Sequence, residues 1–174
     1  MRTKKTLLFL FILSVNIVAA QDKPLWSFAF ASDPLTDKMI DFSPDCKYVA
    51  MGSDHGLTKV HNLTTGAEEI SYNSHPGTVI CVKFHPDGNL LASGGKDGTI
   101  KIYDIVKKAD VITIAAHKKA VMCLSFSPDG TKLFSGSRDN TVKVWDLASG
   151  KQLLNIEDIK GNVRSIQFNP MANP

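Results

Sequence analysis

The sequence predicts an all-β protein made of repeated four-stranded antiparallel sheets, about three of them complete and a fourth begun. The first observation is an internal repeat. Residues 75–104 read HPGTVICVKFHPDGNLLASGGKDGTIKIYD, and residues 117–146 read HKKAVMCLSFSPDGTKLFSGSRDNTVKVWD. The second observation is a Phe-x-Pro signal that recurs every 42 residues, at Phe42, Phe84, Phe126 and Phe168. A repeat of this length, with strands and turns inside each unit, is typical of a β-propeller array.

Each strand of a unit follows from its residues, and the third unit shows this most clearly. Val121–Phe126 is an apolar run rich in strand-forming residues, and Ser127-Pro128-Asp129-Gly130 then turns the chain. Pro fixes φ at about −65°, Asp forms hydrogen bonds with the local backbone, and Gly accepts a positive φ. Arg138-Asp139-Asn140 is a tight hairpin turn between two further strand-like stretches. We therefore expect strands at 121–126, 132–137, 141–146 and 151–156.

The number of units bears on whether the array closes. Four short strands that are apolar on both faces cannot bury themselves, so the units must stack on one another. A propeller closes with about 4–8 such units, so we interpret the chain as the N-terminal part of a longer propeller or as a truncated gene product. A closed four-unit ring and an assembly of several chains are the less favoured alternatives. Three units and a fraction leave an open arc, with an unpaired edge through which the chain could pair.

The two best units resemble the WD repeats of the WD40 β-propeller family. The resemblance rests on a leading His, then Phe-x-Pro-Asp-Gly, then Ser-Gly-x-x-Asp-x-Thr, and a closing Trp145-Asp146 or Tyr103-Asp104. Residues 36–63 carry these signals in degraded form, and residues 161–170 carry only their opening. The resemblance implies WD40-type propeller units at about 31–72, 73–114, 115–156 and, incomplete, 157–174.

The first unit departs from the pattern while its strands keep their character. Cys46 stands where the other units have the turn glycine, Met51 replaces the Ser, His55 the Asp, and His61-Asn62 the closing pair. The turn thereby loses a residue that easily takes a positive φ, and we expect this sheet to form without an internal polar network. Asp22–Phe30, before it, alternates like a strand. By the resemblance this strand would close the last unit of the ring; the alternative is that it edges the first unit.

The N-terminus predicts a secretory signal peptide at residues 1–20. Arg2, Lys4 and Lys5 make a basic start, an apolar stretch follows, and small residues ending at Ala20 precede the cut. The alternative is an anchor that stays attached, but a membrane span needs about 20 apolar residues and this stretch is shorter. We therefore expect an exported protein, periplasmic or extracellular, with no transmembrane segment after cleavage.

The charge of the chain gives no support for nucleic-acid binding. The chain has 20 basic and 17 acidic residues, and residues 1–20 hold three of the basic ones and none of the acidic ones. The mature part, residues 21–174, therefore carries 17 basic residues (20 − 3) against 17 acidic ones. The alkaline pI belongs to the targeting segment, and no nucleic-acid partner is expected.

Two sets of polar residues recur at the repeat spacing. By the resemblance, each set forms a hydrogen-bonded chain that links the second and third strands of a unit to the loop entering its first strand. The sets are His75, Ser93, Asp97 and Tyr103 in the second unit, and His117, Ser135, Asp139 and Trp145 in the third. The alternative is a Ser-His-Asp hydrolase triad, but an active site occurs once and this set occurs twice. We therefore predict a structural role and no catalytic residues; a tyrosine differs in reach from an indole, which leaves the part of Tyr103 open.

No spacing in the sequence indicates a metal or a cofactor. Cys46, Cys81 and Cys123 form no Cys-x-x-Cys pair. Cys81 and Cys123 take the same position in successive units, as small buried residues do, and a disulfide between them would need adjacent strands to approach within a narrow distance window. A third hypothesis, a metal- or cofactor-dependent propeller oxidoreductase, would need a convergent cluster of His, Asp or Glu, and His55, His61 and His75 do not repeat in a way that makes one. We expect neither a metal site nor a cofactor.

The resemblance implies a binding protein or scaffold rather than an enzyme. In such folds the residue before the structural Asp and the residues after the His tend to face one surface. Here these are Lys96, Arg138, Lys118 and Lys119. They predict a basic rim suited to an acidic peptide or an anionic surface; the alternative is scattered solvated lysines. We expect a non-catalytic scaffold that binds a protein or peptide. The second hypothesis is the propeller portion of a larger exported enzyme or envelope-associated assembly.

Overall fold

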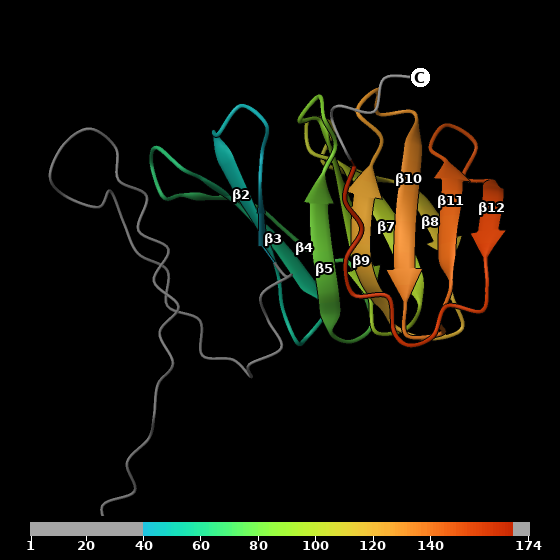
Figure 1. Cartoon of the computed structure of the whole chain (residues 1–174). Coiled ribbons are helices and arrows are strands. Elements are labelled where there is room, and N and C mark those ends of the chain that lie inside the picture. The colour runs from blue at the N-terminus through green and yellow to red at the C-terminus, as the bar shows by residue number, and fades with distance from the viewer. Residues whose placement is uncertain (1–39, 169–174) are drawn as a thin grey trace, which may run out of the picture. The chain divides into compact units, whose positions relative to one another are not determined.

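The computed structural model describes residues 40–168, which form three sheets of four antiparallel strands each (Figure 1). This arrangement confirms the all-β architecture of four-stranded units. Between residues 40 and 168 there is no helix, and so none that is long and apolar enough to cross a membrane. The signal peptide predicted at residues 1–20 and the strand predicted within Asp22–Phe30 lie outside the described residues.

Within each sheet the strands lie side by side in the order of the sequence. The first sheet contains β1 (Ile40–Phe42), β2 (Tyr48–Gly52), β3 (Leu57–Asn62) and β4 (Glu68–Asn73). The second contains β5 (Val79–Phe84), β6 (Leu90–Gly95), β7 (Thr99–Asp104) and β8 (Ala109–Ala115). The third contains β9 (Val121–Phe126), β10 (Lys132–Ser137), β11 (Val142–Asp146) and β12 (Gln152–Ile156).

Hydrophobic contacts between neighbouring sheets form the core. Strands such as β9 are buried on both faces, as their nearly continuous apolar sequence predicts, whereas the outer strands β8 and β12 are mostly exposed. One cluster lies between the first and second sheets, with Ala50, Val60, Ile70, Val79, Val82, Phe84, Leu91 and Tyr103. The other lies between the second and third, with Ala92, Ile100, Ile102, Ile114, Val121, Leu124, Phe126, Leu133 and Trp145 among its members. Removing this apolar surface from water is what holds the sheets face to face.

The loops gather on two opposite edges of the sheets, because the strands are antiparallel and follow one another. The histidine edge carries the turns between the second and third strands of each sheet and the loops that lead into β5 and β9. The proline-turn edge carries the turns after the first strands, with their Pro-Asp pairs, and the turns between the third and fourth strands. The two edges therefore present different loops to solvent.

The turn after β1 keeps its shape although it lacks the glycine of the other units. Cys46 has φ 56°, and its counterparts Gly88 and Gly130 have φ 78° and 72°. A residue with a Cβ in this left-handed region loses about 1–2 kcal/mol. Hydrogen bonds hold this turn in place, because Ser43 Oγ donates to Asp45 over 2.7 Å and accepts from the Tyr48 amide over 2.8 Å.

Residues 157–168 continue the repeat without forming a strand, although the sequence predicts the first strand of a fourth unit here. Val163 still packs on the third sheet, where the Cβ that Gly136 lacks would lie 2.5 Å from Val163 Cγ1. Phe168 meets Phe134 edge to face, with ring centroids 4.6 Å apart. A strand needs a hydrogen-bonded neighbour, and no described strand pairs with this segment.

Candidate functional site

A chain of hydrogen bonds crosses the third sheet on the side of the histidine edge. Trp145 Nε1 on β11 donates to Ser135 Oγ on β10 over 2.8 Å, and Ser135 Oγ lies 2.7 Å from His117 Nε2. His117 Nδ1 lies 3.1 Å from Asp139 Oδ2. Because an ionised carboxylate only accepts, Nδ1 carries the ring proton and Nε2 accepts from the Ser135 hydroxyl. The structure thus brings together all four side chains of the third set.

Burial sets the charge state of this chain. The side chain of His117 is 0% exposed, and burial lowers its pKa below the ordinary value while Asp139 offsets part of that effect. Burial acts against ionisation of Asp139, yet hydrogen bonds from Thr141 and from the Lys118 amide, with His117 beside it, lower the pKa of Asp139 to about 2. At neutral pH the chain therefore holds a neutral imidazole and an ionised carboxylate.

The second sheet contains a shorter version of the chain. His75 Nε2 lies 3.0 Å from Ser93 Oγ, and His75 Nδ1 lies 3.4 Å from Asp97. The part of Tyr103, which the sequence left open, differs from that of Trp145, since among the described residues Tyr103 donates no hydrogen bond to Ser93. Its ring stacks on Tyr72 of the first sheet, with centroids 3.9 Å apart and planes 13° from parallel. An indole carries its N–H on the flank of the ring system, whereas a phenol carries its hydroxyl at the far end, so Tyr103 cannot repeat the contact of Trp145.

Two threonines that the predicted sets leave out also belong to these chains. The amide and hydroxyl of Thr141 both donate to Asp139 Oδ1, over 3.1 and 2.7 Å. Those of Thr99 donate to Asp97 Oδ1 over 3.0 and 2.9 Å. The signal was present in the sequence, because both units carry Thr two residues after the Asp. Each threonine fixes the carboxylate that in turn faces the histidine.

The first sheet holds together without such a chain. Met51 and His55 replace the Ser and Asp of the pattern, and a different buried pair appears there. Thr58 Oγ1 lies 2.7 Å from Ser74 Oγ, and Ser74 Oγ donates to the Gly56 carbonyl over 3.0 Å. These bonds tie β3 to the loop that leads into the second sheet.

The Ser-His-Asp sets are not arranged as a nucleophile with access to substrate. Ser93 and Ser135 are each 0% exposed, whereas a hydrolase serine must reach a substrate carbonyl beside an oxyanion hole. The two sets also repeat at the same place in successive sheets. Within residues 40–168, no three His, Cys, Asp or Glu side chains gather so as to hold a metal ion.

The four cations predicted to form a rim lie on adjoining loops of the histidine edge. Lys96 is in the turn between β6 and β7, and the Cβ that Gly98 lacks in this turn would lie 3.1 Å from the Lys119 carbonyl oxygen. The Arg138 amide donates to the carbonyl of Ala120 over 3.0 Å. The two turns therefore flank the loop of Lys118 and Lys119, and all four cationic residues are exposed.

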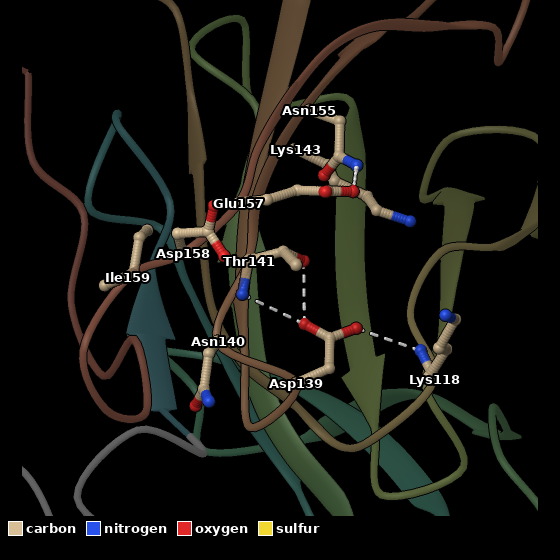
Figure 2. A pocket seen from close by; sticks show the side chains of 9 residues that line it. All are labelled: Lys118, Asp139, Asn140, Thr141, Lys143, Asn155, Glu157, Asp158 and Ile159. Carbon is tan, nitrogen blue, oxygen red and sulfur yellow. Dashed lines mark hydrogen bonds between the residues drawn. The ribbon is translucent and has the colours of Figure 1, made fainter.

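A pocket of about 510 Å³ opens on the same edge, beside the third polar chain (Figure 2). It is lined by Lys118, Asp139, Asn140, Thr141, Lys143, Asn155, Glu157, Asp158 and Ile159. The equivalent turn of the second sheet has Gly98. A Cβ added to Gly98 would lie 2.3 Å from the His117 carbonyl oxygen, so the loop that contains His117 packs directly on this turn. Asn140 occupies this position in the third sheet with φ 65°. Its side chain excludes so close an approach, which leaves the pocket between the turn and residues 157–159.

Comparisons with solved structures show that this fold is known. The crystal structure of the RRP9 WD40 repeats matches with a TM-score of 0.69 and 22% identity, over 75% of this chain and 41% of that one. The crystal structure of a mitotic checkpoint complex matches with a TM-score of 0.72 and 23% identity, over 75% and 40%. The structure of U3-55K matches with a TM-score of 0.69 and 22% identity, over 75% and 42%. The chain thus spans about two fifths of the length of each.

Comparison with family models adds to this likeness in fold. The model described as "WD domain, G-beta repeat" matches residues 66–104 and again residues 109–146. No curated protein matches the sequence. The two family matches cover the sheets that carry the polar chains, and the solved structures share their architecture. Residues 66–104 and 109–146 are therefore repeats of the WD40 family, and the described sheets have the architecture of WD40 propeller structures.

Proposed function

We propose that the chain is a non-catalytic interaction scaffold, and that its basic rim binds an acidic segment of a partner protein. The rim consists of Lys96, Lys118, Lys119 and Arg138. The observation that carries the proposal is the placement of these four exposed cations on adjoining loops of one edge. Members of the family generally bind proteins or peptides.

The charge of the rim is left available for a partner. Among residues 40–168, none of the four cations forms an ion pair with a carboxylate. Asp97 and Asp139, which stand in the same turns, point to His75 and His117, over 3.4 and 3.1 Å. The four cations can therefore attract an oppositely charged partner, although Glu157 and Asp158 line the pocket beside Lys118.

The polar chains supply the rigidity that a docking surface needs. Asp139 accepts hydrogen bonds from the Lys118 amide and from Thr141, so the chain of the third sheet directly fixes the turn and the loop of the rim. Loops held in one conformation lose less entropy when a partner binds. This link between the buried chain and the exposed rim favours a recognition role over a purely structural one.

The experiment measures binding of the blocked acidic pentapeptide acetyl-Glu-Glu-Leu-Glu-Glu-amide by NMR titration. We expect the amide signals of Lys96, Lys118 and Arg138 to move, and the affinity to fall as salt is added. Replacing Lys118 and Arg138 by Glu should weaken binding by at least about tenfold.

The matched control reverses two exposed cations away from the rim, Lys132→Glu and Lys151→Glu. It changes the net charge by the same amount and should leave the affinity within about twofold. Equal weakening by both double variants would show only a general charge effect and would overturn the rim proposal.

We further propose that the scaffold acts in an exported compartment. The support is the basic, then apolar, then small-residue order of residues 1–20. Expression of the full chain should yield an exported product whose N-terminal residue is Gln21. An uncleaved product that stays inside the cell would contradict export without affecting the rim.

A further inference from the structure

A cleft of about 370 Å³ lies on the proline-turn edge, opposite the basic rim, between the first and second sheets. Its floor includes the buried side chains of Val60 and Ile70. Tyr48 and Ile105, both partly buried against the core, form apolar walls. Val106 stands at the mouth and is 73% exposed, the largest value among the exposed large hydrophobic residues of positions 40–168. This combination of apolar floor and exposed apolar lip is typical of a binding surface.

The equivalent cleft between the second and third sheets is filled by a histidine. His85 Nε2 lies 3.0 Å from the Gly130 carbonyl oxygen, and its ring packs edge to face on Phe126 at 5.0 Å. The imidazole comes so close that a Cβ on Gly130 would lie 2.2 Å from Nε2. The position one repeat earlier is Ser43, which is too short to cross. A Cβ on Gly88 would meet only Pro44, at 3.7 Å, so the first cleft is left open.

A second difference between the repeats has the same effect. In the later cleft Ile112 enters the space left by Gly150, where a Cβ would lie 2.2 Å from Ile112 Cδ1. The position one repeat earlier is Lys108, which carries a Cβ at φ 55°. The corresponding Ile70 therefore has no such space to enter and remains in the floor. The residues at two repeat positions, Ser43 and Lys108, thus leave this cleft open where its later equivalent is filled.

The lining of the open cleft is acidic. It includes the carboxylates of Asp45, Glu69 and Asp87 against one ammonium group, that of Lys108. Hydrogen bonds from Ser43 and Lys47 lower the pKa of Asp45 to about 2. Burial acts against ionisation of Asp87, yet bonds from Asn89 and His85 lower its pKa. Both carboxylates are therefore ionised at neutral pH. Counting Lys47, which pairs with Asp45 at 3.0 Å, leaves three negative charges against two positive ones.

We infer that this cleft is a second docking site, for a partner segment in which one branched apolar side chain lies between basic residues. The apolar floor takes the side chain, and the acidic lining attracts the flanking Lys or Arg. The site goes beyond the proposed rim, since the two edges have opposite chemistry. A chain with both sites can hold two different partners at once.

The test is an NMR titration of the chain with acetyl-Lys-Lys-Leu-Lys-Lys-amide and, as a matched probe, with Ser in place of Leu. We expect the leucine peptide to move the amide signals of Gly88, Asn89 and Val106, and to bind about tenfold or more tightly than the serine peptide. Ser43→His, which copies the filled cleft, and Val106→Glu should each weaken the leucine peptide by about tenfold or more. Val111→Glu, at a residue 55% exposed outside the cleft, should have no effect.

Equal affinity for the two peptides, or signal changes elsewhere than at the cleft, would overturn the inference. So would a concentration-dependent dimer in which the Val106 signals shift without peptide, because the occupant would then be a second copy. Circular dichroism checks that the Ser43→His and Val106→Glu variants are folded. If Ser43→His does not fold, Val106→Glu still tests the site, because Val106 is exposed and its substitution should not affect folding. Binding at the basic rim is measured separately, by titration with the acidic peptide and the signals of Lys118 and Arg138. Failure of the cleft proposal can therefore be distinguished from failure of the rim proposal.

Discussion

The second and third sheets carry the same His, Ser and Asp positions, but only the third has an indole at the end of the chain. Trp145 donates to Ser135, whereas Tyr103 stacks on Tyr72 and gives Ser93 no equivalent donor. The first sheet has none of the set and still forms four paired strands. The comparison shows that strand order comes from the turns and the apolar pattern. The polar chain adds stability and fixes loops, and the amount that it adds differs from sheet to sheet.

The largest expected difference concerns the serine at the centre of each chain. Ser135→Ala leaves both the Trp145 indole N–H and His117 Nε2 without a partner, and should lower the free energy of unfolding by about 2–4 kcal/mol. Ser93→Ala leaves His75 Nε2 without one but strands no indole N–H, and should lower the free energy of unfolding by about 1–2 kcal/mol. Urea denaturation of both variants measures the difference.

A third variant isolates the indole. Trp145→Phe removes the N–H donor from the third sheet, so adding Ser135→Ala to it should cost about as much as Ser93→Ala does in the wild type. If Ser135→Ala keeps its full effect without the indole, the contrast between the sheets has another cause.

A smaller effect is expected from pH. Burial holds the pKa of His75 and His117 below the ordinary value in the folded state, while in the unfolded chain they titrate near about 6.5. As pH falls below about 6.5, the unfolded chain binds more protons than the folded one, so stability is lost until the folded pKa is reached. Unfolding free energies at about pH 7.5 and about pH 5.5 should show this decrease.

Variants of the two histidines check the source of the pH dependence. His117→Gln and His75→Gln should each lower the stability at neutral pH, yet reduce the further loss on acidification. The double variant should reduce it most. An unchanged loss between the two pH values would assign the pH dependence to other groups.

The smallest predicted effect tests the first sheet. Cys46 is exposed and has φ 56°, so Cys46→Gly relieves backbone strain and should stabilise the chain by up to about 1 kcal/mol. Cys46→Ala, which removes the thiol and keeps the Cβ, serves as the control and should change stability little. Stabilisation by both variants alike would show that the thiol, rather than the backbone conformation, is responsible.

The repeat made most of the fold predictable. Val121–Phe126 and Lys132–Ser137 were expected as strands and are β9 and β10 with the same limits, because turns with Pro, Asp and Gly bound apolar runs on both sides. The same spacing located His117, Ser135, Asp139 and Trp145. Thr99 and Thr141 belong to the repeated motif but were left out of the polar sets, since their role in holding the carboxylates shows only in the hydrogen-bond geometry.

Features that depend on one side chain meeting another sheet could not be predicted in this way. The spacing places Tyr103 where Trp145 stands, but not the direction of its hydroxyl. Likewise Asn140 and Ser43 look like ordinary turn residues in the sequence. Their effect appears only by comparison with the equivalent residues of the second unit: a neighbouring loop packs against Gly98, and the ring of His85 fills the later cleft. The two openings arise from departures from the repeat rather than from the repeat itself.

The contact between one sheet's turn and the next sheet's histidine gives the array a direction. The His75 amide donates to the Gly56 carbonyl over 3.1 Å, and the His117 amide donates to the Gly98 carbonyl over 2.9 Å. The backbone of each histidine is thus held by the sheet that precedes it in the sequence. Local unfolding of the second sheet would remove the hydrogen bond to the His117 amide. Local unfolding of the third sheet would leave the hydrogen bond of the His75 amide intact. A ligand that binds Lys96, two residues from Gly98, would therefore restrict the motion of His117 and of the third sheet without contacting that sheet.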